Sequence, residues 1–144
     1  MKSRMIHQAQ QQRTFALIFD TGDEVARTLQ DFVDVHHLSG SHFSAIGACS
    51  DVVLAWFDWQ KKEYKKIPIR EQVEVLAFTG DVAEQDGKPK VHGHLVVGKS
   101  DGTAHGGHLI EAHVRPTLEL ILTESPTHLH KKFDPESGLA LIRL

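Results

Sequence analysis

The strongest constraint on the fold is a change in the spacing of apolar residues at Gly40. Before Gly40, four apolar residues recur at the spacing that places them on one face of a helix. These residues are Val25, Leu29, Phe32 and Val33. After Gly40, short runs with strand-like alternation are joined by turns such as 85–87 and 100–102. This order predicts an α+β fold, a mainly antiparallel β-sheet backed by one main helix and short helices.

The local patterns also give approximate element boundaries. The helix is expected to begin at a capping box of Thr21 and Glu24 and to end at 38–40. The predicted strands are 14–19, 42–46, 52–57, 64–69, 73–82, 91–97, 103–114, 117–123 and 139–142. Residues 126–138 are expected to form a loop or a short helix. Residues 1–12 are polar and are expected to form a flexible arm. Residues 13–144 are expected to form a single domain, because a chain of 144 residues is of ordinary domain size.

The charge of the chain argues against a dedicated nucleic-acid-binding domain. The formal net charge is −3 and the pI is near 6.4, whereas such domains usually have a pI above about 9. The densest basic group is Lys61, Lys62, Lys65, Lys66 and Arg70, set against a single Glu63. The pattern favours a solvated hairpin over a DNA-binding patch for this group. One cysteine, a polar N-terminus and no apolar run of about 20 residues predict a cytoplasmic protein without a membrane span.

Histidine is the residue type with the most unusual distribution. The chain has eleven histidines, and His92 and His94 flank Gly93. On a strand, side chains two residues apart leave the same face, and a turn at 100–102 would return His108 beside this pair. Three neutral imidazoles suit zinc or a similar divalent metal and leave a fourth ligand position open. The alternative is a chance pair of surface histidines, and His105 and His113 remain alternative or outer ligands.

Other chemistry in the sequence is weaker. Cys49 lies in a segment that predicts a buried strand, which favours an inert thiol over a nucleophile. Glu74 and Glu119 fall within apolar strands, where a carboxylate either faces solvent or is buried for a functional reason. Trp56 and Trp59 are predicted to lie in the core or in a subunit interface rather than to stack on bases.

Several short motifs occur along the chain in a fixed order. They are GDEV at 22–25, AIGA at 45–48, QVEVL at 72–76, TGD at 79–81, HGH at 92–94, GGHL at 106–109 and PTLE at 116–119. In this order they resemble the plants-and-prokaryotes conserved (PPC) domain, also described as a DNA-binding domain of the PD1-like type. The resemblance covers about residues 13–144.

The resemblance implies properties beyond those of the individual motifs. It implies an antiparallel sheet backed by helices, assembly as a homotrimer, and a metal, commonly zinc, on His92, His94 and His108. The family name implies DNA binding, but plant relatives bind DNA through a separate Arg-Gly-Arg-Pro hook that this chain lacks. Plant relatives also carry a Gly-Arg-Phe-Glu-Ile-Leu segment. Residues 71–76 of this chain match only its last part, a glutamate followed by aliphatic residues.

Two function classes follow. The first is a metal-binding, trimeric PPC-domain protein with a regulatory role. It would contact DNA weakly and without sequence preference through the basic residues of 61–70 and through the N-terminal arm with Lys2, Arg4 and Arg13. The second is a metal-dependent enzyme with hydrolase- or lyase-type chemistry on a small molecule at the open ligand position. In that case Glu74 is the candidate general base.

Overall fold

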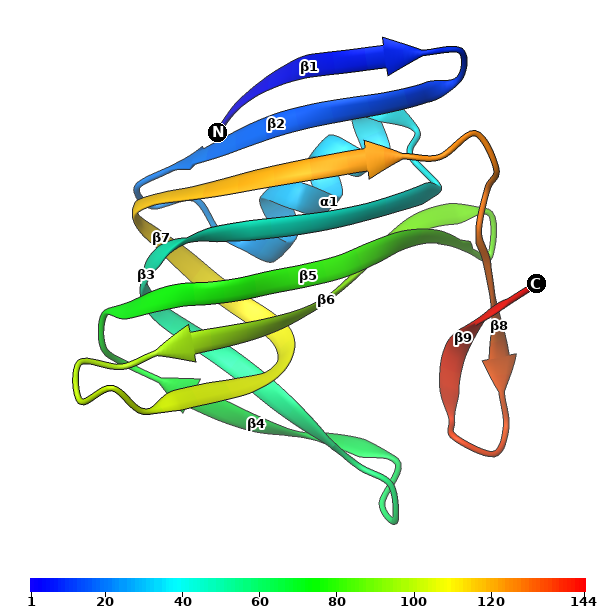
Figure 1. Ribbon diagram of the computed structural model, residues 1–144. Helices are drawn as coiled ribbons and strands as arrows, with labels where there is room; N and C mark the ends of the chain where they lie inside the picture. The colour runs from blue at the N-terminus through cyan, green and yellow to red at the C-terminus, as the bar shows by residue number, and fades with distance from the viewer.

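The computed structural model describes residues 1–144 as a curved sheet of nine strands with one helix against it (Figure 1). In chain order the elements are β1 (Lys2–Ala9), β2 (Gln12–Asp20), α1 (Val25–His36), β3 (Gly40–Asp58), β4 (Glu63–Ile69), β5 (Val73–Gln85), β6 (Lys88–Gly98), β7 (Ala104–Glu124), β8 (His130–Asp134) and β9 (Leu139–Arg143). Every pairing is antiparallel except one short contact between β5 and β8. The predicted α+β class is confirmed, but the expected short helices are absent.

Two long strands organise the sheet. β3 has 19 residues and β7 has 21, where the sequence predicted two separate strands in each region. Gly47 lies at the bend of β3, and a Cβ atom there would be 2.3 Å from the carbonyl oxygen of Thr117 on β7. The apparent break at Gly47 is therefore an irregularity in the ladder, where the two backbones approach closely, and not the end of a strand. Because β6 pairs with both β5 and β7, this half of the sheet curls closed.

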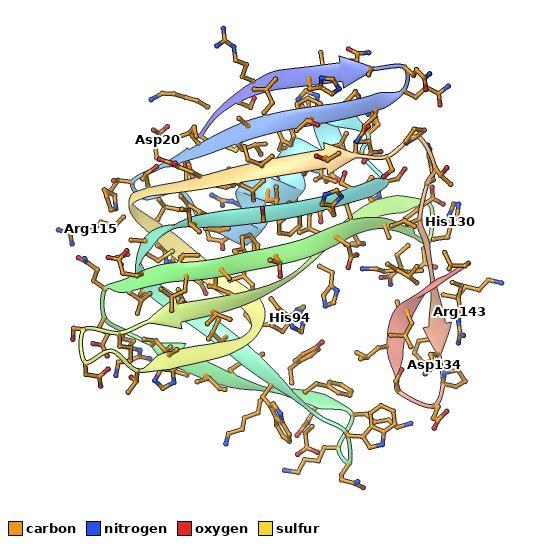
Figure 2. The ribbon with its side chains drawn as sticks, viewed as in Figure 1. Asp20, His94, Arg115, His130, Asp134 and Arg143 are labelled. Atoms are coloured by element: carbon orange, nitrogen blue, oxygen red, sulfur yellow. The ribbon has the colours of Figure 1, made fainter.

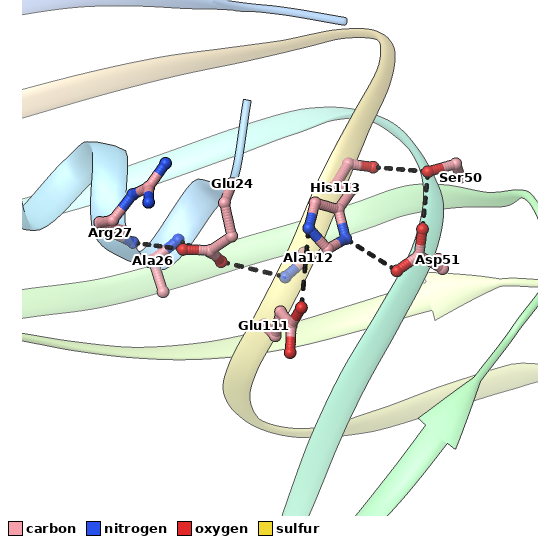
Figure 3. Close-up of polar contacts among 8 residues, drawn as sticks. All are labelled: Glu24, Ala26, Arg27, Ser50, Asp51, Glu111, Ala112 and His113. Carbon is pink, nitrogen blue, oxygen red and sulfur yellow. Dashed lines mark hydrogen bonds and ion pairs between the residues drawn. The ribbon is translucent and has the colours of Figure 1, made fainter. Parts of the chain in front are cut away.

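The helix covers one face of the sheet. Its four predicted apolar residues are all buried, as the helical spacing required. The predicted capping box is wrong in one respect, because Glu24 itself is the N-cap and accepts hydrogen bonds from the backbone N–H groups of Ala26 and Arg27. A further bond from the Ala112 amide to Glu24 ties the helix start to β7 (Figure 3). α1 is the only helix, and no helix is long and apolar enough to cross a membrane.

The core is one cluster of 26 buried residues, contributed by α1 and by strands of the sheet. Cys49 belongs to it and is fully buried. Burial, together with the charge of Asp51, raises the pKa of the Cys49 thiol to about 12. The thiol therefore stays protonated near neutral pH, in agreement with the predicted inert role.

Both ends of the chain differ from the prediction. Residues 2–9, expected as a polar arm, form β1, whose side chains are all exposed and therefore show no apolar alternation. The N-terminal amine holds this strand in place through ion pairs of 3.2 Å to Asp20 and 2.9 Å to Asp23. Residues 126–138, expected as a loop or short helix, contain β8, which pairs with β9 in a C-terminal hairpin beside the sheet (Figure 1).

The sheet face opposite α1 is uncovered and partly apolar. We call it the outer face. Its exposed aliphatic residues are Ile18, Ile46, Leu76 and Ile121. An open groove of about 590 Å³ crosses this face and is lined by Ile46, Leu76, Glu74 and Glu119, among others. Both glutamates are exposed, which confirms the solvent-facing interpretation of the two carboxylates.

Candidate metal centre

Three histidines converge where β6 meets β7. His94 is paired directly with His108 across the two antiparallel strands, and His92 leaves the same face of β6. One ring nitrogen from each of the three side chains lies within 4.8 Å of the other two. The ring centroids are 5.1–5.6 Å apart. We call this set the three-histidine cluster, and its formation agrees with the arrangement that the spacing predicted.

Glycines set the positions of the two strands that carry the cluster. A Cβ atom on Gly93 would lie 2.5 Å from the ring of Phe78, and one on Gly107 would lie 2.6 Å from the carbonyl oxygen of Ala55. Because both contacts are shorter than packing allows, only glycine lets β6 and β7 lie this close to the core. The imidazoles next to these glycines are thereby held at fixed strand positions.

The surroundings lower the pKa of two of the three histidines. Burial, followed by the charges of His92, His94 and Lys131, lowers the pKa of His108 to about 4. Burial and the charge of His92 also lower the pKa of His94. Neutral imidazole is the form that binds a metal, so both residues are in the ligating state near pH 7. The Nδ1 atom of His108 is buried without a hydrogen-bond partner, and a polar atom in that position normally has one.

Three further residues surround the cluster. Asp81 lies opposite His92 in the β5–β6 ladder, and its Oδ2 atom is 3.4 Å from His92 Nδ1. The ammonium group of Lys131 on β8 is 2.9 Å from Asp81 Oδ1. Burial raises the pKa of Asp81, but His92 and Lys131 outweigh it, and the net pKa lies below its usual value. The ring of Tyr64 on β4 stacks on His108 at 4.8 Å.

Sequence reasoning missed these three residues to different degrees. Asp81 could have been found by pairing the predicted hairpin through its 85–87 turn, which places it opposite His92. Tyr64 and Lys131 could not have been found in this way, because they lie on β4 and on the C-terminal hairpin, which are distant in sequence from His92 and His94. Contacts of this kind leave no local pattern.

Glu74, the candidate general base, lies away from the cluster within one chain. It is paired with Gly98, whereas His94 is paired with Thr79. Five residues along β5 separate these positions, which corresponds to about 16 Å of strand. Glu74 lines the groove on the outer face instead.

The other histidines named from the sequence also lie outside the cluster. His105 is exposed and is paired with Val97. His113 Nδ1 donates a hydrogen bond to Asp51 at 2.9 Å, and its other ring nitrogen is 3.6 Å from Glu111 (Figure 3). The hydrogen bond with Asp51 raises the pKa of His113. Ser50 donates to Asp51 at 2.8 Å rather than to the ring, so these residues do not form a nucleophilic triad.

The basic residues 61–70 form an exposed hairpin of β3 and β4, which we call the lysine hairpin. Lys61, Lys62, Lys65, Lys66 and Arg70 are all exposed. Lys65 and Lys66 are consecutive on β4, so their side chains leave opposite faces. Lys62 donates to the carbonyl oxygen of Pro135. The residues therefore gather in one hairpin but not on one surface.

Trp56 and Trp59 belong to the same hairpin. Their side chains are 58% and 53% exposed in the single chain, so neither is in the core of the protomer. The predicted core location is therefore wrong for both, and a subunit interface stays a prediction.

Comparisons with known proteins agree with this architecture. The family model of the Plants and Prokaryotes Conserved (PCC) domain matches residues 6–126. A metal-containing protein from Archaeoglobus fulgidus is 33% identical, with 100% of each chain covered and a TM-score of 0.84. A plant- and prokaryote-conserved protein from Pyrococcus horikoshii is 30% identical, with 92% of each chain covered and a TM-score of 0.85.

A third solved structure is also similar. It is a protein from Ralstonia eutropha named as a candidate DNA-binding protein, 27% identical, with 90% of each chain covered and a TM-score of 0.83. No curated protein matches the chain in sequence.

Proposed function

Because the chain belongs to the Plants and Prokaryotes Conserved domain family, we propose that it is a metal-binding member that holds one divalent ion, zinc, on His92, His94 and His108. The observation that carries the proposal is the convergence of three ring nitrogens within 4.8 Å. Nitrogens at 2.0–2.1 Å from a tetrahedral zinc ion lie about 3.4 Å apart, so a contraction of at most about 1.4 Å reaches coordination distance.

Three further observations support the metal. The buried Nδ1 atom of His108 lacks a hydrogen-bond partner, and coordination of a metal ion by this atom would supply one. Asp81 beside His92 is the kind of carboxylate that orients a ligating imidazole. The relative from Archaeoglobus fulgidus, described as metal-containing, is similar over the whole chain.

The proposed assembly is a homotrimer. The outer face exposes Ile46 by 63% and Leu76 by 53%, and no element of the chain covers them. An apolar surface of this kind is an association surface. A particle of 16.1 kDa at micromolar concentration in light scattering would contradict the trimer.

DNA contact is proposed as a secondary property of a regulatory protein. The Ralstonia eutropha relative is named as a candidate DNA-binding protein. In this chain the charge is −3, and the exposed lysines point in different directions, so any phosphate contact would be weak and independent of sequence.

A metal-dependent enzyme is the second candidate function. A cavity of about 360 Å³ next to the cluster favours it, because a small molecule could reach the open ligand position. A bound divalent ion supplies Lewis-acid chemistry of the hydrolase or lyase type. Glu74, the candidate base, could act there only from a neighbouring chain of the proposed trimer.

The metal assignment is tested by elemental analysis of the purified protein after zinc loading and gel filtration. The wild type is expected to carry one zinc ion per chain, and the His92→Ala/His94→Ala variant none. His105→Ala is the matched control, because His105 lies on β7 outside the cluster and should keep full occupancy. Full occupancy in the double variant would show that the ion binds elsewhere.

A further inference from the structure

A cavity of about 360 Å³ separates the three-histidine cluster from the C-terminal hairpin. His92 and Tyr64 form part of its wall on the sheet side, and residues of β8 and β9 form the opposite wall. Figure 2 shows the His94 side chain directed from β6 toward the space between the sheet and this hairpin. The volume is near the lower end of the range of about 300–1,000 Å³ found for small-molecule sites. The hairpin lies beyond residue 126, where the match to the family model ends.

The charges around this cavity favour an anion. The Lys131 side chain is only 7% exposed, lines the cavity and forms an ion pair with Asp81. Lys90 also lines the cavity, and Asp81 is the only carboxylate in contact with either His92 or Lys131. With a divalent ion bound to neutral imidazoles, the site also contains the ammonium groups of Lys90 and Lys131 and the carboxylate of Asp81. The sum of these charges is positive. In a partly buried site such an excess of positive charge is unfavourable unless an anion balances it.

Apart from Gln85 and Gly138, the rest of the cavity wall is apolar. Val91 on β6, Leu139, Ala140 and Leu141 on β9, and the Phe133 ring on β8 line it. A ligand that fits this surface carries a hydrocarbon portion as well as its charge. Inorganic phosphate would leave the apolar wall without a partner, and a cation would be repelled by Lys131 and by the metal ion.

Resting on the proposed metal site, we infer that this cavity binds a small organic carboxylate with a short apolar chain. Lys131 recognises the carboxylate group beside the metal centre, and the chain packs against Val91 and the β9 residues. The C-terminal hairpin therefore serves as the ligand-binding wall of the site. Lys131 is held in position for this role by its ion pair with Asp81, which also holds His92.

The inference is tested by titration calorimetry on the zinc-loaded full chain with 3-methylbutanoate. Its uncharged isostere 3-methylbutanamide and inorganic phosphate are the comparison ligands. The acid is expected to bind at least about tenfold more tightly than either, because a hydrogen bond to a charged group contributes about 1.5–3 kcal/mol. Lys131→Met should lose at least about tenfold in affinity for the acid, and Lys131→Arg should retain most of it. Lys132→Met is the matched control, since Lys132 is exposed and does not line the cavity.

A second pair of variants covers the case in which Lys131→Met disturbs the hairpin. Leu141→Glu places a negative charge on the cavity wall and should weaken binding of the acid. Ile142→Glu, at a similarly exposed neighbour outside the cavity, should not. Leu141→Glu with wild-type affinity for the acid would overturn the inference.

The zinc content of each sample separates the two proposals. If zinc is present and the acid, amide and phosphate bind alike, or Lys131→Met binds the acid as the wild type does, the carboxylate site is wrong and the metal site stands. If the wild type holds no zinc, the metal site is wrong, and the carboxylate site that rests on it is overturned as well.

Discussion

The three-histidine cluster and the lysine hairpin each concentrate one kind of polar side chain, but strand geometry treats them differently. His92 and His94 are two residues apart on β6 and leave the same face, where β7 brings His108 to them. Lys65 and Lys66 are adjacent on β4 and leave opposite faces. Spacing along a strand, and not the density of a residue type, decides whether side chains form a site.

The two regions also differ in how firmly the surrounding structure holds them. The cluster is flanked by glycines that the core requires, and Asp81 and Tyr64 contact its imidazoles. The lysine hairpin protrudes from the sheet (Figure 1), and its five basic side chains are exposed. A site that is held in place favours a specific ligand, whereas exposed charges on opposite faces favour weak and general contacts.

Removal of one ligand is expected to have the largest effect. His108→Ala should lower zinc affinity by more than the loss of about 10–100-fold that is typical of changes in outer-shell residues. Competition with a fluorescent chelator measures this affinity. His105→Ala on the same strand should leave it unchanged, and equal losses in both variants would remove the distinction between the cluster and other surface histidines.

Removal of the carboxylate behind His92 should have the next largest effect. Asp81→Asn is expected to lower zinc affinity by about 10–100-fold, because the carboxylate orients the imidazole and strengthens it as a ligand. The same chelator competition applies, and zinc stoichiometry at saturation should stay at one per chain. Asp101→Asn, in a turn where Asp101 bonds only with Thr103, is the control. An unchanged affinity in Asp81→Asn would show that Asp81 has no role at the centre.

The glycine that supports the cluster gives a stability prediction. Gly93→Ala should lower the free energy of unfolding by about 1–3 kcal/mol, because the new Cβ atom overpacks against Phe78. Urea denaturation of the metal-free protein measures this change. In Gly106→Ala the nearest atom is 3.4 Å from the new Cβ, so that variant should remain close to wild type. If both variants unfold at the same urea concentration as the wild type, the close packing of β6 is not a constraint.

The lysine hairpin should show only small, additive effects on DNA binding. Lys65→Glu and Lys66→Glu should each weaken binding to fluorescent duplexes slightly and by similar factors, since the two side chains lie on opposite faces. Binding should be seen near 50 mM salt and be largely lost near 200 mM, for every duplex sequence. Nanomolar binding to one sequence at the higher salt, abolished by one of these substitutions, would show that the hairpin is a specific DNA-binding surface.

The smallest expected effect is a pH-dependent contribution of His113, which lies outside the cluster, to the stability of the fold. The hydrogen bond with Asp51 raises the pKa of His113, so its stabilisation is complete below about 6.5 and is lost as the pH rises through the folded-state pKa. The contribution should be below about 1 kcal/mol, because both side chains are more than one third exposed. Urea denaturation at pH 6 and pH 8.5 should show a smaller pH difference in His113→Gln than in the wild type. An equal difference in the two proteins would show that the pair does not contribute.

The sequence predicted those parts of the molecule that leave a local pattern. The apolar face of α1, the alternation in β5 and the return of His108 to His92 and His94 all follow from residue spacing. β1 was missed because all of its side chains are exposed and only its backbone is paired. The predicted break within β3 was wrong because Gly47 marks a close approach to β7, which depends on a residue 70 positions away. Lys131 was missed for the same reason, since the C-terminal hairpin brings it to Asp81 across 50 residues.

The central claim is that His92, His94 and His108 hold one metal ion together. X-ray absorption spectroscopy at the zinc edge of the loaded protein tests it most directly, because it reports the ligands around the ion. The expected spectrum shows three imidazole nitrogens at about 2.0–2.1 Å and one further light ligand, with no sulfur at about 2.3 Å. A spectrum with one imidazole or none, or with a sulfur ligand from Cys49, would contradict the account.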